Sequence, residues 1–446
     1  METRVYFDFL KYCLGNEVDM RAAVVKMNWQ HLFAFAKKQT ILGICLEGVE
    51  RLGEEYPEEI KRNPIKLNLL QEWLAKGIQI RKLNVRGNAV AAKLYAQLRE
   101  AGLRCCVLKG QGNALMYPNP YARTPGDVDM WVNASREQII DYAKKHFEIG
   151  DDIRYHHLET TLDGILVELH FFPCIMNNPM YNRRLQAWFK RNTDWQYSNV
   201  VQLPDGAGEI VVPTAAFNII YQLSHIYHHF FDEGIGMRQM VDYYYVLMSL
   251  PQMSQTSTDG SEEKNKKNTR EACSLSSKGS DDGSVLSACE QAHAANTDPS
   301  SMQRAASACL SSENTAFGSK TSHPDGNTKQ KTQNVKQSTL RYLGLYDFAG
   351  AVMYVLHEVL GLPEERMIAP MDAKRGKLLL SEIMDGGNFG KHATKYGHFT
   401  QQGSAKKYFL KIWRNMHFVR YYPAEALSEP IFRTWHFFWR LFLKAK

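Results

Sequence analysis

The sequence has 446 residues, of which 44% are hydrophobic, 11% aromatic and 23% charged, and it carries a formal net charge of +7. At about 150 residues per domain this length predicts two or three units, and the composition is too apolar for a chain that is disordered throughout. The modest charge is compatible with phosphate-bearing partners but falls short of a surface that coats nucleic acid, so a nucleic-acid partner is not favoured.

Eight cysteines are present, none of them in CxxC spacing, which argues against a zinc ribbon or a disulfide framework. The N-terminal stretch METRVYFDFLKYC contains acidic residues and no apolar run followed by a cleavage site, so no secretion signal is predicted. No stretch approaches the roughly 18 uncharged apolar residues that a membrane span needs. We therefore expect a cytoplasmic protein with no membrane span.

Residues 1–100 are predicted to form a helical N-terminal region. Apolar residues recur three and four positions apart in HLFAFAKKQTILGICLEGVERL and in KLNLLQEWLAKGIQIRKLNVRGNAVAAKLYAQLREAG. This spacing is typical of helices that bury one face.

Residues 101–175 are predicted to form a small mixed sheet with helices, which makes the fold class α+β. Short strands are expected at residues 104–108, 127–132 and 165–171. Asp163 and Gly164 are expected to form the turn of the hairpin that leads into the last of these strands. Ser135 is expected to cap a helix that extends to about His146.

The rest of the folded chain is predicted to be helical, at residues 176–251 and 339–446. Between these two regions, residues 252–338 are rich in Ser, Thr, Asn, Gln, Gly and Lys, and Phe317 is their only aromatic residue. Such a tract buries too little apolar surface to offset a backbone ordering cost of about 1–2 kcal/mol per residue. We therefore expect a disordered insertion at residues 252–338.

Two features stand out in the C-terminal region. The stretch GGNFG, residues 386–390, marks a tight turn. The aromatic and basic stretch FRTWHFFWRLFLKAK is expected to form a helix that packs its aromatic side chains into the domain, rather than one that lies on a membrane surface.

The stretch VLKGQGNALMYPNPYARTPGDVDMWV, residues 107–132, contains the candidate site. Side chains along a strand alternate between two faces, so Asp127 and Asp129 share one face. Two carboxylates there repel each other unless a divalent cation such as Mg²⁺ neutralises them. Glu168, in VELH on an apolar strand of the same sheet, is the candidate third carboxylate. The Asp-x-Asp pattern alone is common, and most copies bind no metal.

Glycines and cations around the aspartates indicate a site for phosphates. Gly126 lets a ligand approach closely, and Lys109-Gly110 ends the preceding strand at the mouth of a helix, where free amides and an ammonium favour anions. Arg123 is a further candidate contact, and so is Arg238, which begins a helix after two glycines. Taken singly, each of these cations is more often a solvated surface residue.

Histidines are expected to support the site rather than to bind metal. Those of SHIYHHFF, residues 224–231, lie at helical spacing and are expected to be interfacial or buried core residues. His156, His157 and His170 flank Glu168, and one of them is expected to orient that carboxylate or to pack beside it.

Together these residues resemble a known family. The chain is similar to the uncharacterised bacterial nucleotidyltransferase family, within the DNA polymerase beta-like nucleotidyltransferase superfamily, at Leu108-Lys109-Gly110, Ala114, Tyr117-Pro118, Pro120, Arg123 and Gly126-Asp127-Val128-Asp129. VELH, residues 167–170, and GIGMRQMVD, residues 234–242, resemble two other recurring blocks of that family. The wider superfamily carries Gly-Gly or Gly-Ser where this chain has Lys109-Gly110.

The resemblance implies a small mixed nucleotidyltransferase sheet flanked by helices, with a site for two Mg²⁺ ions. Asp127, Asp129 and Glu168 would hold the ions, and Glu168 would also activate the acceptor hydroxyl. Gly110, with the helix after it, would hold a nucleoside triphosphate. The metals and nearby cations would offset the charge that develops on the leaving pyrophosphate.

The predicted function is therefore magnesium-dependent transfer of a nucleotidyl group from a nucleoside triphosphate to an unidentified hydroxyl or phosphate acceptor; phosphoryl transfer would use the same parts. The alternative is a catalytically inactive binding or scaffold protein with this fold, which the presence of three carboxylates disfavours. Asp129→Asn is expected to abolish metal-dependent nucleotide binding and to leave the melting temperature unchanged or higher, because like-charge repulsion is removed.

Overall fold

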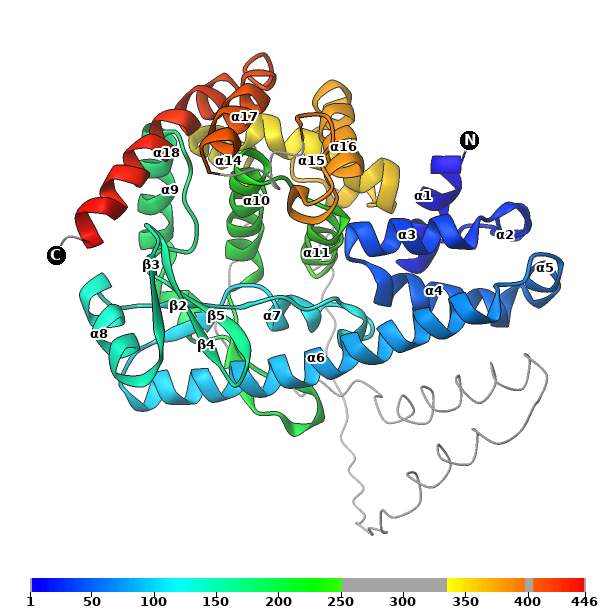
Figure 1. Cartoon of the computed structure of the whole chain (residues 1–446), viewed down its shortest axis with the longest axis horizontal. Helices are drawn as coiled ribbons and strands as arrows, with labels where there is room; N and C mark the ends of the chain where they lie inside the picture. The colour runs from blue at the N-terminus through cyan, green and yellow to red at the C-terminus, as the bar shows by residue number, and fades with distance from the viewer. Residues whose placement is uncertain (1, 251–334, 398–403, 445–446) are drawn as a thin grey trace, which may run out of the picture. The chain divides into compact units, whose positions relative to one another are not determined.

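The computed structural model describes residues 2–250, 335–397 and 404–444. Of the predicted insertion, residues 252–334 lie outside the described residues. Within the described part, helices surround a small mixed sheet (Figure 1), and this confirms the predicted α+β fold class.

A five-stranded sheet forms the centre of the fold. Its strands are β1 (Cys105–Val107), β2 (Val128–Val132), β3 (Ile149–Ile153), β4 (His157–Leu162) and β5 (Ile165–His170). Their order in space is β1-β2-β5-β4-β3, with β2 and β5 parallel and the other neighbours antiparallel. The three strands expected from the sequence are present as β1, β2 and β5. β1 is one residue shorter than expected at each end, and β2 and β5 are each one residue shorter at one end.

Local sequence signals account for two connections in this sheet. Asp163 and Gly164 join β4 to β5 with φ values of 49° and 74°, which are left-handed conformations that Asp and Gly adopt more readily than most residues. Ser135 Oγ accepts a hydrogen bond from Gln138 N at 3.3 Å, and Gln138 Oε1 accepts one from Ser135 N at 2.9 Å. This capping box begins helix α8 (Arg136–His146), as predicted.

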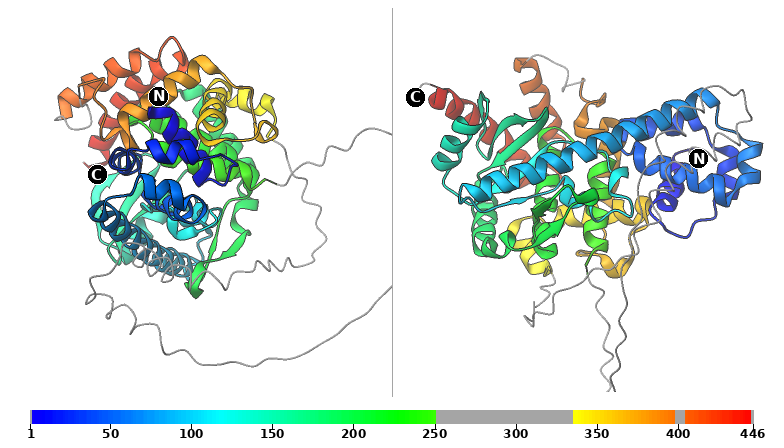
Figure 2. Two further views of the ribbon diagram at one scale, coloured as in Figure 1. Left: turned by 90° about the vertical axis from the view of Figure 1, so that its right-hand side faces the viewer. Right: turned by 90° about the horizontal axis from the view of Figure 1, so that it is seen from below.

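Six helices precede the sheet. They are α1 (Glu2–Cys13), α2 (Arg21–Lys26), α3 (Trp29–Gln39), α4 (Leu42–Glu55), α5 (Pro57–Arg62) and α6 (Leu67–Glu100). The long helix α6 runs past the sheet in Figures 1 and 2 and contacts β1, β2 and β5. Val90, Leu94 and Leu98 recur four residues apart along it and are buried, so one face of α6 closes one side of the fold.

Helices α9 (Pro179–Asn192), α10 (Ala215–Asp232) and α11 (Met237–Met248) follow the sheet. Trp131 of β2 stacks on Phe217 of α10 with ring centroids 5.6 Å apart, which attaches α10 to the sheet. Between α9 and α10 lies a two-stranded sheet of β6 (Val200–Gln202) and β7 (Glu209–Val211). The shorter helices η2 (Asp194–Tyr197) and η3 (Pro204–Gly206) belong to this part, whereas α7 (Gln111–Ala114) and η1 (Pro120–Ala122) lie between β1 and β2.

The chain after residue 335 adds a further helical layer. Its elements are α14 (Gln337–Leu343), α15 (Tyr346–Leu360), η4 (Glu364–Arg366), α16 (Ala373–Gly386), η5 (Asn388–Gly390), α17 (Ser404–Met416) and α18 (Pro423–Lys444). Gln39 at the end of α3 bridges this layer to α11, because its amide donates to Ile383 O and accepts from Met237 N, each at 2.9 Å. The buried Gln39 therefore has both ends of its amide satisfied.

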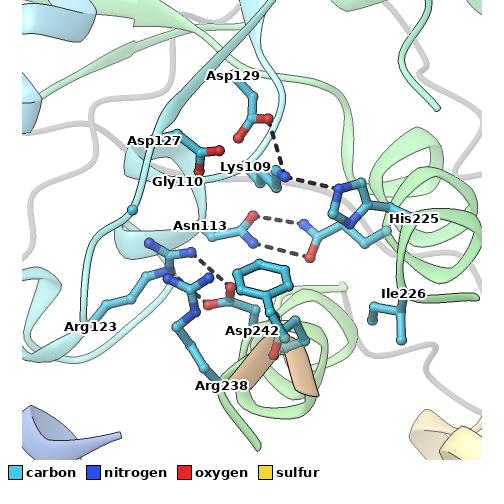
Figure 3. A pocket seen from close by; sticks show the side chains of 14 residues that line it. Lys109, Gly110, Asn113, Arg123, Asp127, Asp129, His225, Ile226, Arg238 and Asp242 are labelled. Carbon is cyan, nitrogen blue, oxygen red and sulfur yellow. Dashed lines mark hydrogen bonds and ion pairs between the residues drawn. The ribbon is translucent and has the colours of Figure 1, made fainter. Parts of the chain in front are cut away.

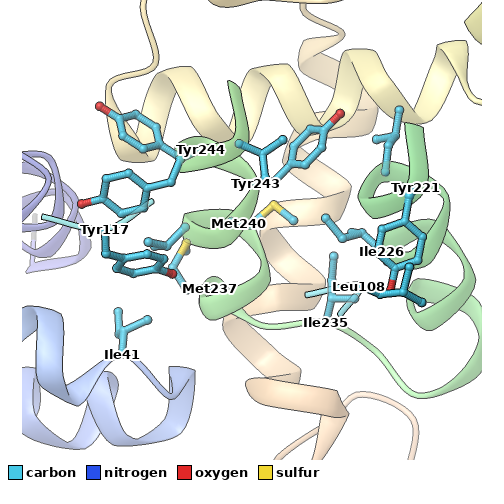
Figure 4. Close-up of a cluster of buried hydrophobic side chains, with 14 of the residues drawn as sticks. Ile41, Leu108, Tyr117, Tyr221, Ile226, Ile235, Met237, Met240, Tyr243 and Tyr244 are labelled. Carbon is cyan, nitrogen blue, oxygen red and sulfur yellow. The ribbon is translucent and has the colours of Figure 1, made fainter. Parts of the chain in front are cut away.

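Buried apolar side chains form a cluster that runs from the N-terminal helices through the sheet to α15 and α16. Figure 4 shows the part of it around α11, where Met240 and Tyr243 lie near Ile226 of α10 and Leu108 of the sheet region. The site described below lies beside this core and is built on its rigid elements.

Helix α18 only partly matches the expectation that its aromatic side chains pack into the domain. Phe432 and Trp435 contact Tyr155, with ring centroids 6.1 and 5.4 Å apart. Phe437 and Phe438, in contrast, are 52% and 53% exposed. None of the helices in the described residues is sufficiently long and apolar to cross a bilayer.

Candidate active site

Three carboxylates meet on one face of the sheet. Asp129 of β2 and Glu168 of β5 are direct partners in the parallel register, and Asp127 lies two residues before Asp129, so its side chain points to the same face. Carboxylate oxygens of all three residues lie within 4.8 Å of one another. The structure thus brings together the three acidic residues that the sequence analysis selected.

Two cations contact this carboxylate cluster. Lys109 Nζ lies 3.1 Å from Asp129 Oδ1, and His170 Nε2 lies 3.1 Å from both Asp129 Oδ1 and Glu168 Oε2. Asp129 is fully buried, and its other oxygen, Oδ2, has no hydrogen-bond partner among the described residues. Lys109 and His170 therefore neutralise much of the negative charge, while one buried acceptor stays open.

These contacts separate the pKa values of the two aspartates. Burial raises the pKa of Asp129, but Lys109 and His170 outweigh burial and hold it well below its ordinary value. The charge of Asp129, followed by burial, raises the pKa of Asp127 to about 6. Burial lowers the pKa of His170, but its hydrogen bonds to Asp129 and Glu168 prevail and raise it to about 9. At neutral pH the group between Asp129 and Glu168 is thus an imidazolium.

A pocket opens beside this cluster (Figure 3). Of the residues predicted for the site, those that line it are Lys109, Gly110, Arg123, Gly126, Asp127, Asp129 and Arg238. Glu168 lies next to Asp129 in the carboxylate cluster. Asn113 of α7 and Gln222 of α10 also line the pocket, and their amides exchange two hydrogen bonds of 3.0 and 2.7 Å. This pair attaches α7 to α10 beneath the carboxylates.

Arg123 has a buried acidic partner. Its Nε and Nη2 atoms donate to the two oxygens of Asp242 on α11, each at 2.8 Å, and Tyr117 donates its hydroxyl to the same carboxylate at 2.5 Å. Such a two-pronged ion pair fixes the geometry of both partners. Arg123 therefore ties η1 and the loop before β2 to α11, and its guanidinium is only partly available to a phosphate.

Arg238 is the less committed guanidinium of the pocket. Its Nη1 donates to Thr124 O at 3.3 Å, and its Nε has no hydrogen-bond partner within the part of the chain that the structure describes. A Cβ atom on Gly126 would lie 3.4 Å from Arg238 Nη1. This is an ordinary contact, so Arg238 lies beside Gly126 without requiring a glycine there, and the close approach of a ligand at Gly126 stays a prediction.

The segment after Lys109 differs from the expected anion cradle at a helix start. Gly110 has a φ of 57°, and the helix that follows it, α7, has four residues. Gly112 N already donates to Lys109 O at 3.0 Å. A single turn carries little of the macrodipole of a longer helix, so the positive charge near this part of the pocket comes from side chains.

The sequence analysis did not assign several polar residues that the pocket contains. Asp242 lies within the GIGMRQMVD block, but its partner Arg123 is 119 residues away, and only the tertiary fold reveals the pair. Asn113 and Gln222 carried no sequence signal. His225 was expected to be an interfacial or buried core residue; it is partly buried and lines the pocket, and the Lys109 ammonium lies 2.9 Å from its Nε2.

The GGNFG turn contributes to the pocket as well. Phe389 has a φ of 52° and lines the pocket, with the Arg238 guanidinium 5.7 Å from its ring centroid. Asn388 accepts a hydrogen bond from Gln239 at 3.0 Å. The turn thus packs on the first residues of α11 and holds Arg238 over the pocket.

Comparison with known proteins gives the family. The chain matches the family described as "Uncharacterised nucleotidyltransferase" over residues 26–274. It belongs to this nucleotidyltransferase family. All eight predicted site residues fall within the matched range, whereas the GGNFG turn lies beyond it.

Among solved structures, the chain is similar to an antigenic nucleotidyltransferase-like protein from Paracoccidioides brasiliensis. The identity is 16%, the alignment covers 38% of this chain and 82% of that one, and the TM-score is 0.25. No curated protein matches this member of the nucleotidyltransferase family.

Proposed function

We propose that the protein is a magnesium-dependent nucleotidyltransferase, which moves a nucleotidyl group from a nucleoside triphosphate to a hydroxyl or phosphate acceptor. The observation that carries this proposal is the approach of Asp127, Asp129 and Glu168 to within 4.8 Å of one another beside a pocket with positive side chains. Membership of the nucleotidyltransferase family supports the same reaction class.

The donor set fits magnesium. Carboxylate oxygens are the hard ligands that Mg²⁺ prefers, and the buried, unpartnered Oδ2 of Asp129 within the described residues is an acceptor that a cation would satisfy. Asp127, Asp129 and Glu168 would hold two ions. When bound, the ions would polarise the phosphate and offset charge on the attacking and leaving oxygens.

The side chains of the protein would bind and orient the triphosphate. Lys109 contacts Asp129 and His225; with Asp129 holding a cation, its ammonium would be able to contact a phosphate oxygen. Arg238 is the second candidate phosphate contact, because its guanidinium borders the pocket and is the less committed of the two. Burial raises the pKa of Glu168, but the His170 hydrogen bond together with the charges of His157 and His170 lowers it on balance, so Glu168 is ionised. In the proposed reaction this carboxylate would accept the proton of the acceptor hydroxyl.

One observation favours the alternative, a binding or scaffold protein without turnover. Lys109 and His170 already pair with Asp129, so the carboxylates are largely neutralised by the protein itself. In that case nucleotide would bind without being consumed. The two functions therefore differ in whether pyrophosphate is released.

A product assay distinguishes them. The full-length protein is incubated with Mg²⁺, each nucleoside triphosphate and a small-molecule extract of cells, and both pyrophosphate and nucleotide-modified products are followed by mass spectrometry. We expect a product whose mass has increased by one nucleoside monophosphate unit, with loss of both signals in Glu168→Gln. Triphosphate binding without release of pyrophosphate in any extract would instead support the scaffold function.

A further inference from the structure

Glu168 also faces two histidines. His157 of β4 and His170 of β5 are direct partners in the antiparallel register, and Glu168 lies two residues before His170, so all three side chains point to one face of the sheet. His157 Nδ1 lies 3.3 Å from Glu168 Oε2, and His170 Nε2 lies 3.1 Å from the same oxygen. Two imidazole nitrogens and one carboxylate oxygen therefore converge.

The spacing of these three atoms suits a metal ion. Ligands bound at about 2.0–2.1 Å in a tetrahedral site lie roughly 3.3–3.4 Å from each other. The two distances to Glu168 Oε2 are close to this value, and the ligand atoms of His157, Glu168 and His170 all lie within 4.8 Å of one another. A divalent cation that displaces the proton on His170 Nε2 can thus contact all three atoms with small side-chain adjustments.

The far nitrogens of both rings face acceptors. His170 Nδ1 lies 3.3 Å from Phe172 O, and His157 Nε2 lies 3.6 Å from Glu159 Oε1, which Arg154 contacts at 2.7 Å. In metal sites a ligating histidine commonly donates its other N–H to a carbonyl or a carboxylate, and this contact fixes which nitrogen faces the ion. His170 is oriented in that way by Phe172 O, whereas His157 Nε2 only faces Glu159 from beyond hydrogen-bond distance. The near nitrogens of both rings lie toward Glu168.

His157 supplies an independent observation. Its side chain is 3% exposed, and neither of its nitrogens has a hydrogen-bond partner in the described residues. Buried polar atoms are almost always hydrogen-bonded, and an unsatisfied one costs free energy. An ion at Glu168 would satisfy the His157 Nδ1 lone pair.

We propose that His157, Glu168 and His170 bind a divalent transition-metal ion of the zinc and cobalt class. Imidazole nitrogens suit such ions, whereas Mg²⁺ prefers oxygen ligands. The site shares Glu168 with the Asp127 and Asp129 oxygen cluster but differs from it in donor type. It does not depend on nucleotidyl transfer, since the three ligands and their contacts require no nucleotide.

Cobalt binding tests the proposal without nucleotide. Metal-free full-length protein is titrated with Co²⁺ while visible d–d absorption is recorded, and Zn²⁺ is titrated calorimetrically in parallel. We expect one ion per chain with an absorption typical of nitrogen and oxygen ligands. His157→Gln should weaken the affinity at least tenfold, whereas Asp127→Asn should retain the Co²⁺ spectrum.

His156→Gln is the matched control. Its ring lies 4.2 Å from the His157 ring, centroid to centroid, and it is not among the three converging ligands. An unchanged Co²⁺ spectrum in His157→Gln, or an equal loss in His156→Gln, would overturn the assignment. If His157→Gln fails to fold by circular dichroism, His170→Gln provides the same comparison. Failure of nucleotide binding or turnover leaves these spectra unaffected, so the two proposals fail separately.

Discussion

The two aspartates of the site differ in what surrounds them, although they lie on one face of one strand. Asp129 is fully buried and contacts Lys109 and His170 at 3.1 Å. The charge of Asp129 is in turn the largest cause of the raised pKa of Asp127. Substituting the two residues therefore has opposite effects on stability.

Asp127→Asn is expected to stabilise the metal-free protein at alkaline pH. The pKa of Asp127 in the folded state is about 6, above its ordinary value of 3.8, so folding becomes less favourable as pH rises through that interval. The asparagine amide does not ionise, so the variant does not lose stability over this pH interval. Thermal unfolding in a chelator should show a higher melting temperature for the variant at pH 8 and almost none of that gain at pH 4. An equal rise in melting temperature at pH 4 and pH 8 would show that charge repulsion between Asp127 and Asp129 is not its cause.

Asp129→Asn is expected to destabilise the protein, by about 3–5 kcal/mol, which is typical when one partner of a buried ion pair is removed. The contacts with Lys109 and His170 revise the expectation from sequence, where only repulsion between the aspartates was considered. Chemical denaturation beside Asp127→Asn provides the comparison. Equal stability of the two variants would show that Lys109 and His170 do not depend on Asp129.

At the scale of elements, the start of α11 depends on a close backbone contact. A Cβ atom on Gly236 would lie 2.8 Å from Asn388 Cα and 2.9 Å from Asn388 N. Backbone atoms cannot move aside as a flexible side chain does, so only glycine fits here. Arg238 follows two residues later, and its position over the pocket depends on this contact.

Gly236→Ala should therefore lower stability by about 1–3 kcal/mol, as overpacking does, and should weaken magnesium-dependent triphosphate binding by displacing Arg238. Gly386→Ala, in the GGNFG stretch that Gly236 packs against, is the matched control, because its Cβ would lie 3.9 Å from Ala393 Cβ, an ordinary contact. Calorimetric titration and thermal unfolding of both variants measure the effects. An unchanged triphosphate affinity in Gly236→Ala would show that the position of Arg238 does not matter for nucleotide binding.

Patterns among neighbouring residues in the sequence predicted helices, strands and turns well. They did not predict which of these elements contact one another. The Asp163-Gly164 turn and the Ser135 cap depend on neighbouring residues and were found as expected. The length of α7, four residues, was not anticipated, although Pro118 and Pro120, which lack a backbone N–H, follow it closely and do not continue a helix. Strand alternation alone placed Asp127 and Asp129 on one face, whereas the approach of Glu168 also depends on the pairing of β5 with β2, which alternation does not predict.

At the scale of the whole molecule, side chains after residue 335 complete the structure formed by residues 2–250. Lys411 donates to Asp232 at 2.9 Å, and Arg414 donates to Phe230 O at 2.7 Å. Glu425 accepts a hydrogen bond from Asn177 N at 2.9 Å. These contacts and the shared apolar core join parts of the chain that lie on either side of residues 251–334.

Two separate chains, residues 1–250 and 335–446, are therefore expected to associate when produced together. The contacts named above join residues of the first chain directly to residues of the second. The predicted site residues all lie in the first chain. Affinity purification through a tag on one chain, followed by size-exclusion chromatography, should recover both in equal amounts. Recovery of the tagged chain alone would show that residues 251–334 are needed for assembly.

The central claim is that three carboxylates and the neighbouring cations bind a nucleoside triphosphate through Mg²⁺. Isothermal titration of full-length protein with each triphosphate, in Mg²⁺ and in a chelator, tests this claim most directly. We predict binding in Mg²⁺ only, and its loss in Asp127→Asn, which keeps the Lys109 and His170 contacts of Asp129. Equal binding in the chelator, or full affinity in the variant, would contradict the account.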